Sequence, residues 1–164
     1  MGAMTNWKTV LLLLAAVAGA ALAVWPRLGT ADLGGVDFAT LARRESPNDA
    51  LACTPQFCAA SADVAAPVFA LPPVEVLRAV QQAVAGEPRV EQVAADAESG
   101  TLRYVQRSRL MGFPDTINVK VMPVPDGGST VLLYSRSKLG HSDMGVNRAR
   151  LERWIGLIEE AAQK

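Results

Sequence analysis

The segment from Thr101 to Lys138 constrains the fold of this chain most strongly, because apolar and polar residues alternate along it with a period of two. Such alternation is typical of strands that pack one face and leave the other open. The turn sequence Pro125–Gly128 (P-D-G-G) within this segment is a strong hairpin signal. The residues predicted to face the core are Leu102, Tyr104, Ile117, Val119, Val121, Val131 and Leu133.

The surrounding residues predict further strands and two helices. Strands are expected at residues 88–96, 101–109, 114–124 and 129–138. A helix is expected from the prolines at 72–73 to Gly86, and a second from Asp143, a good N-cap residue, to about Ala162. Together these elements predict an α+β domain: a four-stranded antiparallel meander with two helices packed on one face, preceded by an N-terminal hydrophobic helix.

The N-terminal hydrophobic segment, Val10–Trp25, contains no charged residue. As a helix it measures about 24 Å, a little less than the roughly 30 Å of a hydrocarbon core. Residues 1–27 are therefore interpreted as a membrane anchor or a signal segment. Lys8 on the short side favours a location at the bacterial inner membrane with the C-terminal domain in the periplasm. Cleavage near Ala23, followed by release into the periplasm, is the alternative.

Residues 28–66 lack a sustained period and are interpreted as a linker that precedes an α+β domain at 67–164. The linker contains Cys53 and Cys58, the two cysteines of the chain. In an oxidising compartment a disulfide that closes a small loop is the natural interpretation. Free thiols, or redox or metal chemistry, are the alternatives.

Charge and motifs exclude several function classes. The formal net charge is zero, so no strong field attracts nucleic acid. No phosphate-binding glycine loop, paired zinc ligands or nucleophile elbow occurs, and we predict no catalytic residue, metal site or cofactor. His141 lies beside Ser142 and Asp143, but sequence neighbours rarely assemble a triad, so a solvated or capping histidine is the preferred interpretation.

The arginines of the C-terminal third are the candidate binding residues. Helical spacing from Leu151 places Asn147 and Arg148 at the start of the buried helix face. There Arg148 would form an internal brace with Asp115 or Asp143, or else an anion pocket with Arg107 and the helix N-terminus. A second hypothesis places cationic side chains on the open face of the sheet, where they would receive lipid phosphates or an acidic partner, or only keep that face soluble. These are Arg103, Arg107, Arg109, Lys120, Arg136 and Lys138.

Three motifs carry a family resemblance. They are P-N-D at Pro47–Asp49, R-S-x-x-x-x-F-x-D at Arg107–Asp115, and S-R-S-x-x-G-x-S-D-x-G-x-N-R-x-R at Ser135–Arg150. Over residues 45–160 the chain resembles domain-of-unknown-function family 1499, which occurs in bacteria and plastids. The resemblance implies an envelope-associated domain and assigns no activity.

Two functional hypotheses follow. The first is a membrane-tethered periplasmic domain, attached through its N-terminal helix, that binds an anionic ligand, a lipid headgroup or an acidic envelope protein. Its candidate binding or bracing residues are Arg107, Arg109, Asp115, Arg136, Asp143, Asn147 and Arg148. The alternative is an enzyme whose pocket is built around Arg107, Asp115, Ser142, Asp143 and Arg148.

Overall fold

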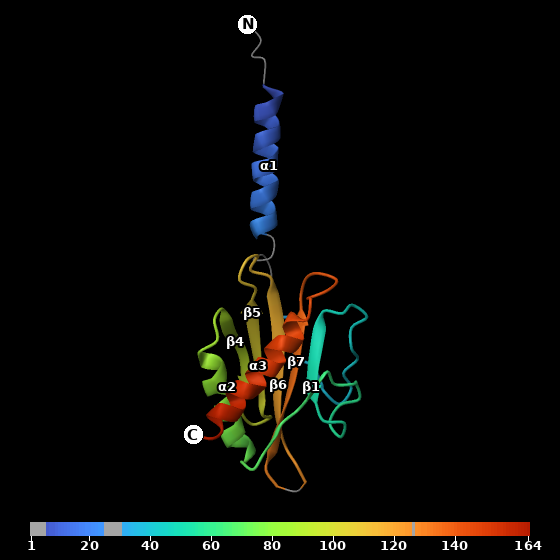
Figure 1. Ribbon diagram of the computed structural model, residues 1–164, viewed down its shortest axis with the longest axis vertical. Coiled ribbons are helices and arrows are strands. Elements are labelled where there is room, and N and C mark those ends of the chain that lie inside the picture. Colours follow the sequence, from blue (N-terminus) through green and yellow to red (C-terminus); the bar gives the residue numbers. More distant parts are fainter. Residues whose placement is uncertain (1–5, 25–30, 126) are drawn as a thin grey trace.

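The computed structural model describes residues 6–24, 31–125 and 127–164. The described residues form three helices and one seven-stranded sheet (Figure 1). In chain order the elements are α1 (Trp7–Val24), β1 (Asp49–Cys53), β2 (Val64–Ala65), β3 (Val68–Phe69), α2 (Pro73–Ala85), β4 (Val90–Asp96), β5 (Thr101–Arg107), β6 (Pro114–Pro123), β7 (Ser129–Ser137) and α3 (Val146–Ala161).

The sheet has the strand order β2-β1-β7-β6-β5-β4, and β3 pairs with β7 beyond the end of β1. Strands β4 to β7 form the expected antiparallel series, in which Leu102 lies opposite Val119 and Val119 opposite Leu133. The expected four-stranded meander is nevertheless wrong. The sheet has seven strands, and it is mixed because β1 and β2 run parallel.

The missed strand β1 comes from the segment that was expected to be a linker. It lies between β2 and β7 and is buried on both faces, so its sequence, D-A-L-A-C, shows no alternation. Ala50 and Ala52 belong to the core under the helices, whereas Leu51 and Cys53 belong to a second core on the opposite face. Strand β1 could therefore not be predicted from a local sequence pattern, because it is defined by its pairing with β2 and β7.

Helices α2 and α3 cover one face of the sheet, here called the helix face (Figure 1). Val80 and Trp154 are fully buried between the helices and the strands. The Trp154 ring meets the Tyr104 ring edge to face, with the ring centroids 5.6 Å apart. Glu87, just after α2, accepts a hydrogen bond from Trp154 Nε1 (3.2 Å) and pairs with Arg153. These contacts fix α3 against both α2 and the sheet.

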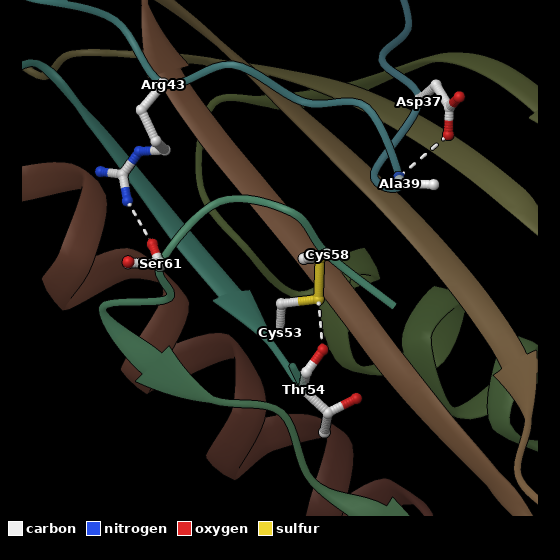
Figure 2. Close-up of a disulfide and its surroundings, with 7 residues drawn as sticks. All are labelled: Asp37, Ala39, Arg43, Cys53, Thr54, Cys58 and Ser61. Carbon is white, nitrogen blue, oxygen red and sulfur yellow. Dashed lines mark hydrogen bonds between the residues drawn. A yellow bond between two sulfur atoms is a disulfide. The ribbon is translucent and has the colours of Figure 1, made fainter. Parts of the chain in front are cut away.

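The opposite face, here called the second face, is covered by residues 31–48 and 54–62, which flank β1 in the sequence. Phe38 from this segment is buried against Leu132 and Tyr134 of β7. The disulfide Cys53–Cys58 is present and holds a short loop on the same face (Figure 2). The expected open sheet face is therefore corrected, because the presumed linker supplies a second packed layer.

The N-terminal helix α1 presents large apolar side chains to solvent, among them Leu12 and Leu13. The expected fold placed a membrane-type helix here. Among the described residues, no helix is both long and apolar enough to cross a membrane, and the expectation is corrected on this point too.

Candidate functional site

A buried polar cluster joins the N-terminal half of α3 to the helix face of the sheet. Its centre is Arg150, which is 9% exposed. The guanidinium donates from Nη2 to Asp115 Oδ2 on β6 (2.6 Å) and from Nε to Gln106 Oε1 on β5 (2.5 Å). Nη1 donates to Ser135 Oγ on β7 and to Asn147 Oδ1. One planar cation therefore binds groups from three adjacent strands.

Asn147 extends this cluster to Asn48, just before β1, and to the loop before α3. Its Nδ2 donates to the backbone carbonyl of Asn48 (3.0 Å) and to Asp143 Oδ2 (2.6 Å). Asp143 Oδ2 also accepts a hydrogen bond from the Asn147 amide in the first turn of α3. The helix itself starts at Val146, three residues after the expected cap. Five residues from the motifs therefore meet in one internal hydrogen-bond network: Asp115, Ser135, Asp143, Asn147 and Arg150.

Arg148 is not part of this network, so its expected role as an internal brace is wrong. Its side chain is 61% exposed and pairs with Glu152 one helical turn further on. The bracing arginine was expected at position 148 and is observed at position 150, two residues further along α3. Arg150, which the sequence analysis did not select, makes the predicted pair with Asp115. Arg150 lies four residues before the buried Trp154, but this spacing alone does not choose between Arg150 and Arg148.

A second ionic cluster surrounds Asp49 on the second face. Arg43 donates to Asp49 Oδ1 (2.7 Å) and also pairs with Asp63. The Tyr134 hydroxyl donates to Asp49 Oδ2 (2.5 Å). Burial acts to raise the pKa of Asp49, but hydrogen bonds from Arg43, Tyr134 and the backbone amide of Arg44 outweigh it and lower the pKa. The carboxylate is thereby held ionised beneath the layer on the second face.

Two side chains of the expected cationic surface, Arg103 and Arg136, bind that layer. Arg103 pairs with Asp32 (2.8 Å). Arg136 donates to the carbonyls of Leu33 and Gly34, and burial lowers its pKa. These arginines therefore attach residues 32–34 to the sheet. The pockets that could hold a ligand lie at the two ends of the second face.

One end of the second face carries a pocket of about 410 Å³, here called the arginine pocket. It is lined by Arg89, Arg107 and Arg109, together with Ser108 and one carboxylate, Glu91. Arg89 Nε donates to the Arg107 carbonyl, and Arg107 Nη1 donates to the Gly112 carbonyl (3.2 Å), so backbone groups hold two of the arginines in place. In the described part of the chain, Arg109 makes no hydrogen bond or ion pair. Of the predicted binding residues, only Arg107 and Arg109 come together here.

The loop beside this pocket exposes apolar side chains. Residues 108–113 close through hydrogen bonds from the Gly112 amide to the Ser108 carbonyl and from the Phe113 amide to Ser108 Oγ. Leu110 at its tip is 88% exposed. The loop between β7 and α3, with exposed Met144, lies at the same end of the sheet (Figure 1). The Leu33 amide donates to Thr116 near the start of β6, so the N-terminal segment also joins the domain at this end.

The alternative enzyme pocket is not assembled. Asp115 is buried against Arg150, Asp143 is engaged by Asn147, and Arg148 points to solvent. Among the described residues, no three potential ligand side chains are placed to hold a metal ion.

Comparison with known proteins identifies the family. The family model "Protein of unknown function (DUF1499)" matches residues 45–158. No curated protein matches the chain. Protein CV1439 from Chromobacterium violaceum, a solved structure, is 13% identical with a TM-score of 0.42, and the match covers 71% of this chain and 96% of that chain. The resemblance of the three motifs is thus confirmed, and the chain belongs to the DUF1499 family.

Proposed function

We propose that this domain works outside the cytoplasm, in the periplasm, and binds the phosphates of an anionic lipid surface through the arginine pocket. The observation that carries the proposal is the meeting of three arginines with a single carboxylate beside an exposed apolar loop. Guanidinium groups bind phosphate oxygens through paired hydrogen bonds. The apolar tip at Leu110 would enter the headgroup region next to them.

The location of these groups supports a surface as the partner. The arginine pocket, the 108–113 loop and the point where the N-terminal segment joins the domain all lie at one end of the sheet. An N-terminal segment held near a membrane would therefore bring this end of the domain toward the lipid headgroups. The disulfide and the uncharged run at Val10–Trp25 support export, since disulfides persist in oxidising compartments.

The test is co-sedimentation of the full-length chain with phosphatidylcholine vesicles, with and without phosphatidylglycerol. We expect binding that requires phosphatidylglycerol and weakens as salt is added. Arg109→Ala should weaken it about fivefold, the effect of about 1 kcal/mol per basic residue near the surface. Leu110→Asp should weaken it as well.

Matched variants control for general effects of charge and apolarity. Arg148→Ala removes an exposed arginine from α3, and Val74→Asp alters an exposed valine near the start of α2, at the other end of the molecule. Both should bind as the unaltered protein does. Equal binding by Arg109→Ala and Arg148→Ala would refute the proposal, whereas displacement by millimolar inorganic phosphate alone would indicate a soluble anion as the ligand.

A further inference from the structure

A larger pocket lies at the other end of β5, away from the arginine pocket. Thr101, the first residue of β5, lines it, whereas Arg107, the last, lines the arginine pocket. Its volume is about 640 Å³, within the roughly 300–1,000 Å³ that is usual for small-molecule sites. We call it the disulfide pocket, because Cys58 is part of its wall.

Three parts of the chain form the walls of the disulfide pocket. Residues 36–39 form one wall, the disulfide loop at 55–59 forms another, and strands β6 and β7 form the floor. Figure 2 shows the disulfide between Cys53 on the sheet and Cys58 on the loop, with Asp37 and Ala39 on a neighbouring segment. Because the bond ties the loop to β1, the pocket is bounded by covalently restrained chain.

The lining is mostly apolar and carries one cation. Phe38, Phe57, Met122 and Leu132 supply apolar surface. The cation is Lys120 on β6, which is partly buried. Within the described residues the Lys120 side chain forms no hydrogen bond or ion pair, although its charge contributes to the lowered pKa of Asp96. Arg103 and Arg136, on the same face, both have bound partners.

The carboxylate in the pocket wall, Asp37, forms no ion pair with Lys120. Asp37 Oδ1 accepts a hydrogen bond from the Ala39 amide (3.0 Å; Figure 2), and Oδ2 accepts one from Thr40 Oγ1 (3.1 Å). This carboxylate is therefore engaged by its own turn. An apolar pocket with a lysine whose charge is not paired favours a ligand with both an apolar body and a negative group.

We infer that the disulfide pocket binds a single-chain amphiphile with one anionic head group, a carboxylate or a phosphate monoester. Lys120 Nζ donates to the head group, and the alkyl chain lies against Phe57, Met122 and Leu132. This site is separate from the arginine pocket, and its ligand enters the protein instead of remaining in a lipid surface.

Isothermal titration calorimetry of the full-length chain tests the inference, with dodecanoate below its critical micelle concentration as the probe. Dodecanoate should bind one to one, whereas acetate and dodecyl maltoside should bind at least tenfold more weakly. Lys120→Gln should weaken dodecanoate binding about tenfold, as expected for the loss of one charge-assisted hydrogen bond. Dodecyl phosphate serves as the second arm, and the tighter of the two probes identifies the head group.

A filling variant separates the pocket from other apolar surface, notably the exposed side chains of α1. Ala59→Trp places an indole on the pocket wall and should abolish binding. Ala62→Trp, at an exposed position outside the pocket wall, is the matched control and should bind as the unaltered protein does. Binding of dodecanoate to Ala59→Trp with unchanged affinity would overturn the inference, as would equal affinity for dodecyl maltoside or no binding of either anionic probe.

Discussion

Arg150 of α3 donates to Asp115 of β6 across 2.6 Å, and both side chains are less than a tenth exposed. Asp115 lies on the same strand as the core residues Ile117 and Val119, so the pair connects the last helix to the middle of the sheet. A buried ion pair of this kind stabilises a fold mainly through the large penalty for removing one partner.

Arg150→Ala should therefore lower the free energy of unfolding by about 3–5 kcal/mol, because it leaves the Asp115 carboxylate buried without its cation. Arg150→Lys should recover only part of the lost stability, since an ammonium cannot reproduce the planar hydrogen-bonding geometry of a guanidinium. Denaturant unfolding of the full-length chain measures both. Arg148→Ala is the control and should leave the unfolding midpoint unchanged, because its ion pair is exposed. Equal losses in the two alanine variants would contradict the brace at Arg150.

The two buried tyrosines should respond differently to loss of their hydroxyl groups. The Tyr134 hydroxyl donates to Asp49, so Tyr134→Phe should cost about 1.5–3 kcal/mol at neutral pH. The Tyr104 hydroxyl is buried and has no partner in the described part of the chain, and burial raises its pKa to about 12. Tyr104→Phe should therefore keep or raise stability. Thermal unfolding measures the stability of both variants. A larger loss of stability in Tyr104→Phe than in Tyr134→Phe would refute these hydrogen-bond assignments.

The free energy of unfolding should depend on pH through the protonation of Asp49. Its pKa in the folded protein lies below the ordinary value of 3.8, so the unfolded chain binds the proton more readily. The stabilisation is complete above that ordinary value and is lost as the pH falls through the lower folded value. Asp49→Asn should flatten the dependence of unfolding free energy on pH below about pH 4. An unchanged slope in this variant would show that Asp49 is not the responsible group.

Loss of the disulfide should weaken the protein without unfolding it. The bond joins cysteines five residues apart, and the entropic estimate for so short a loop is about 2 kcal/mol. Strand β1 still pairs with β7 when the bond is absent, so the Cys53→Ser/Cys58→Ser double variant should fold. Its unfolding midpoint gives the cost. In the unaltered protein, alkylation should label both cysteines only after reduction, and immediate labelling would argue against an oxidising location.

The proposed location is tested in cells. Fractionation should find the full-length chain with the bacterial inner membrane and its C-terminal domain open to protease added to spheroplasts. Trimming after Ala23 with soluble release would favour the cleaved periplasmic form, which the sequence analysis left open. Protection from protease until the cells are lysed would contradict export in either form.

The candidate site was predictable only in part. The motifs directed attention to Arg107, Asp115, Asp143 and Asn147, and the structure does place the last three in one network. At 100° per residue, Arg148 and Arg150 lie roughly 70° and 90° to opposite sides of the apolar stripe of α3. Periodicity therefore could not decide which flank meets the sheet. Arg89 was not among the predicted residues because it lies just before β4, whereas Arg107 and Arg109 lie at the end of β5 or just after it. The three arginines line one pocket because β4 and β5 pair in the sheet.

By itself the sequence determined the strands β4 to β7, helix α2, the position of the core stripe of α3 and the disulfide, because each depends on local periodicity, turn chemistry or the only available cysteine pair. Tertiary structure alone decided the remainder. Strand β1 is a strand because β2 and β7 pair with it. Residues 31–48 form a layer because Arg103, Arg136 and Leu132 bind or pack against them. The contacts with β5 and β7 join residues about 70 to 100 positions apart, and a local pattern carries no signal of a partner so distant.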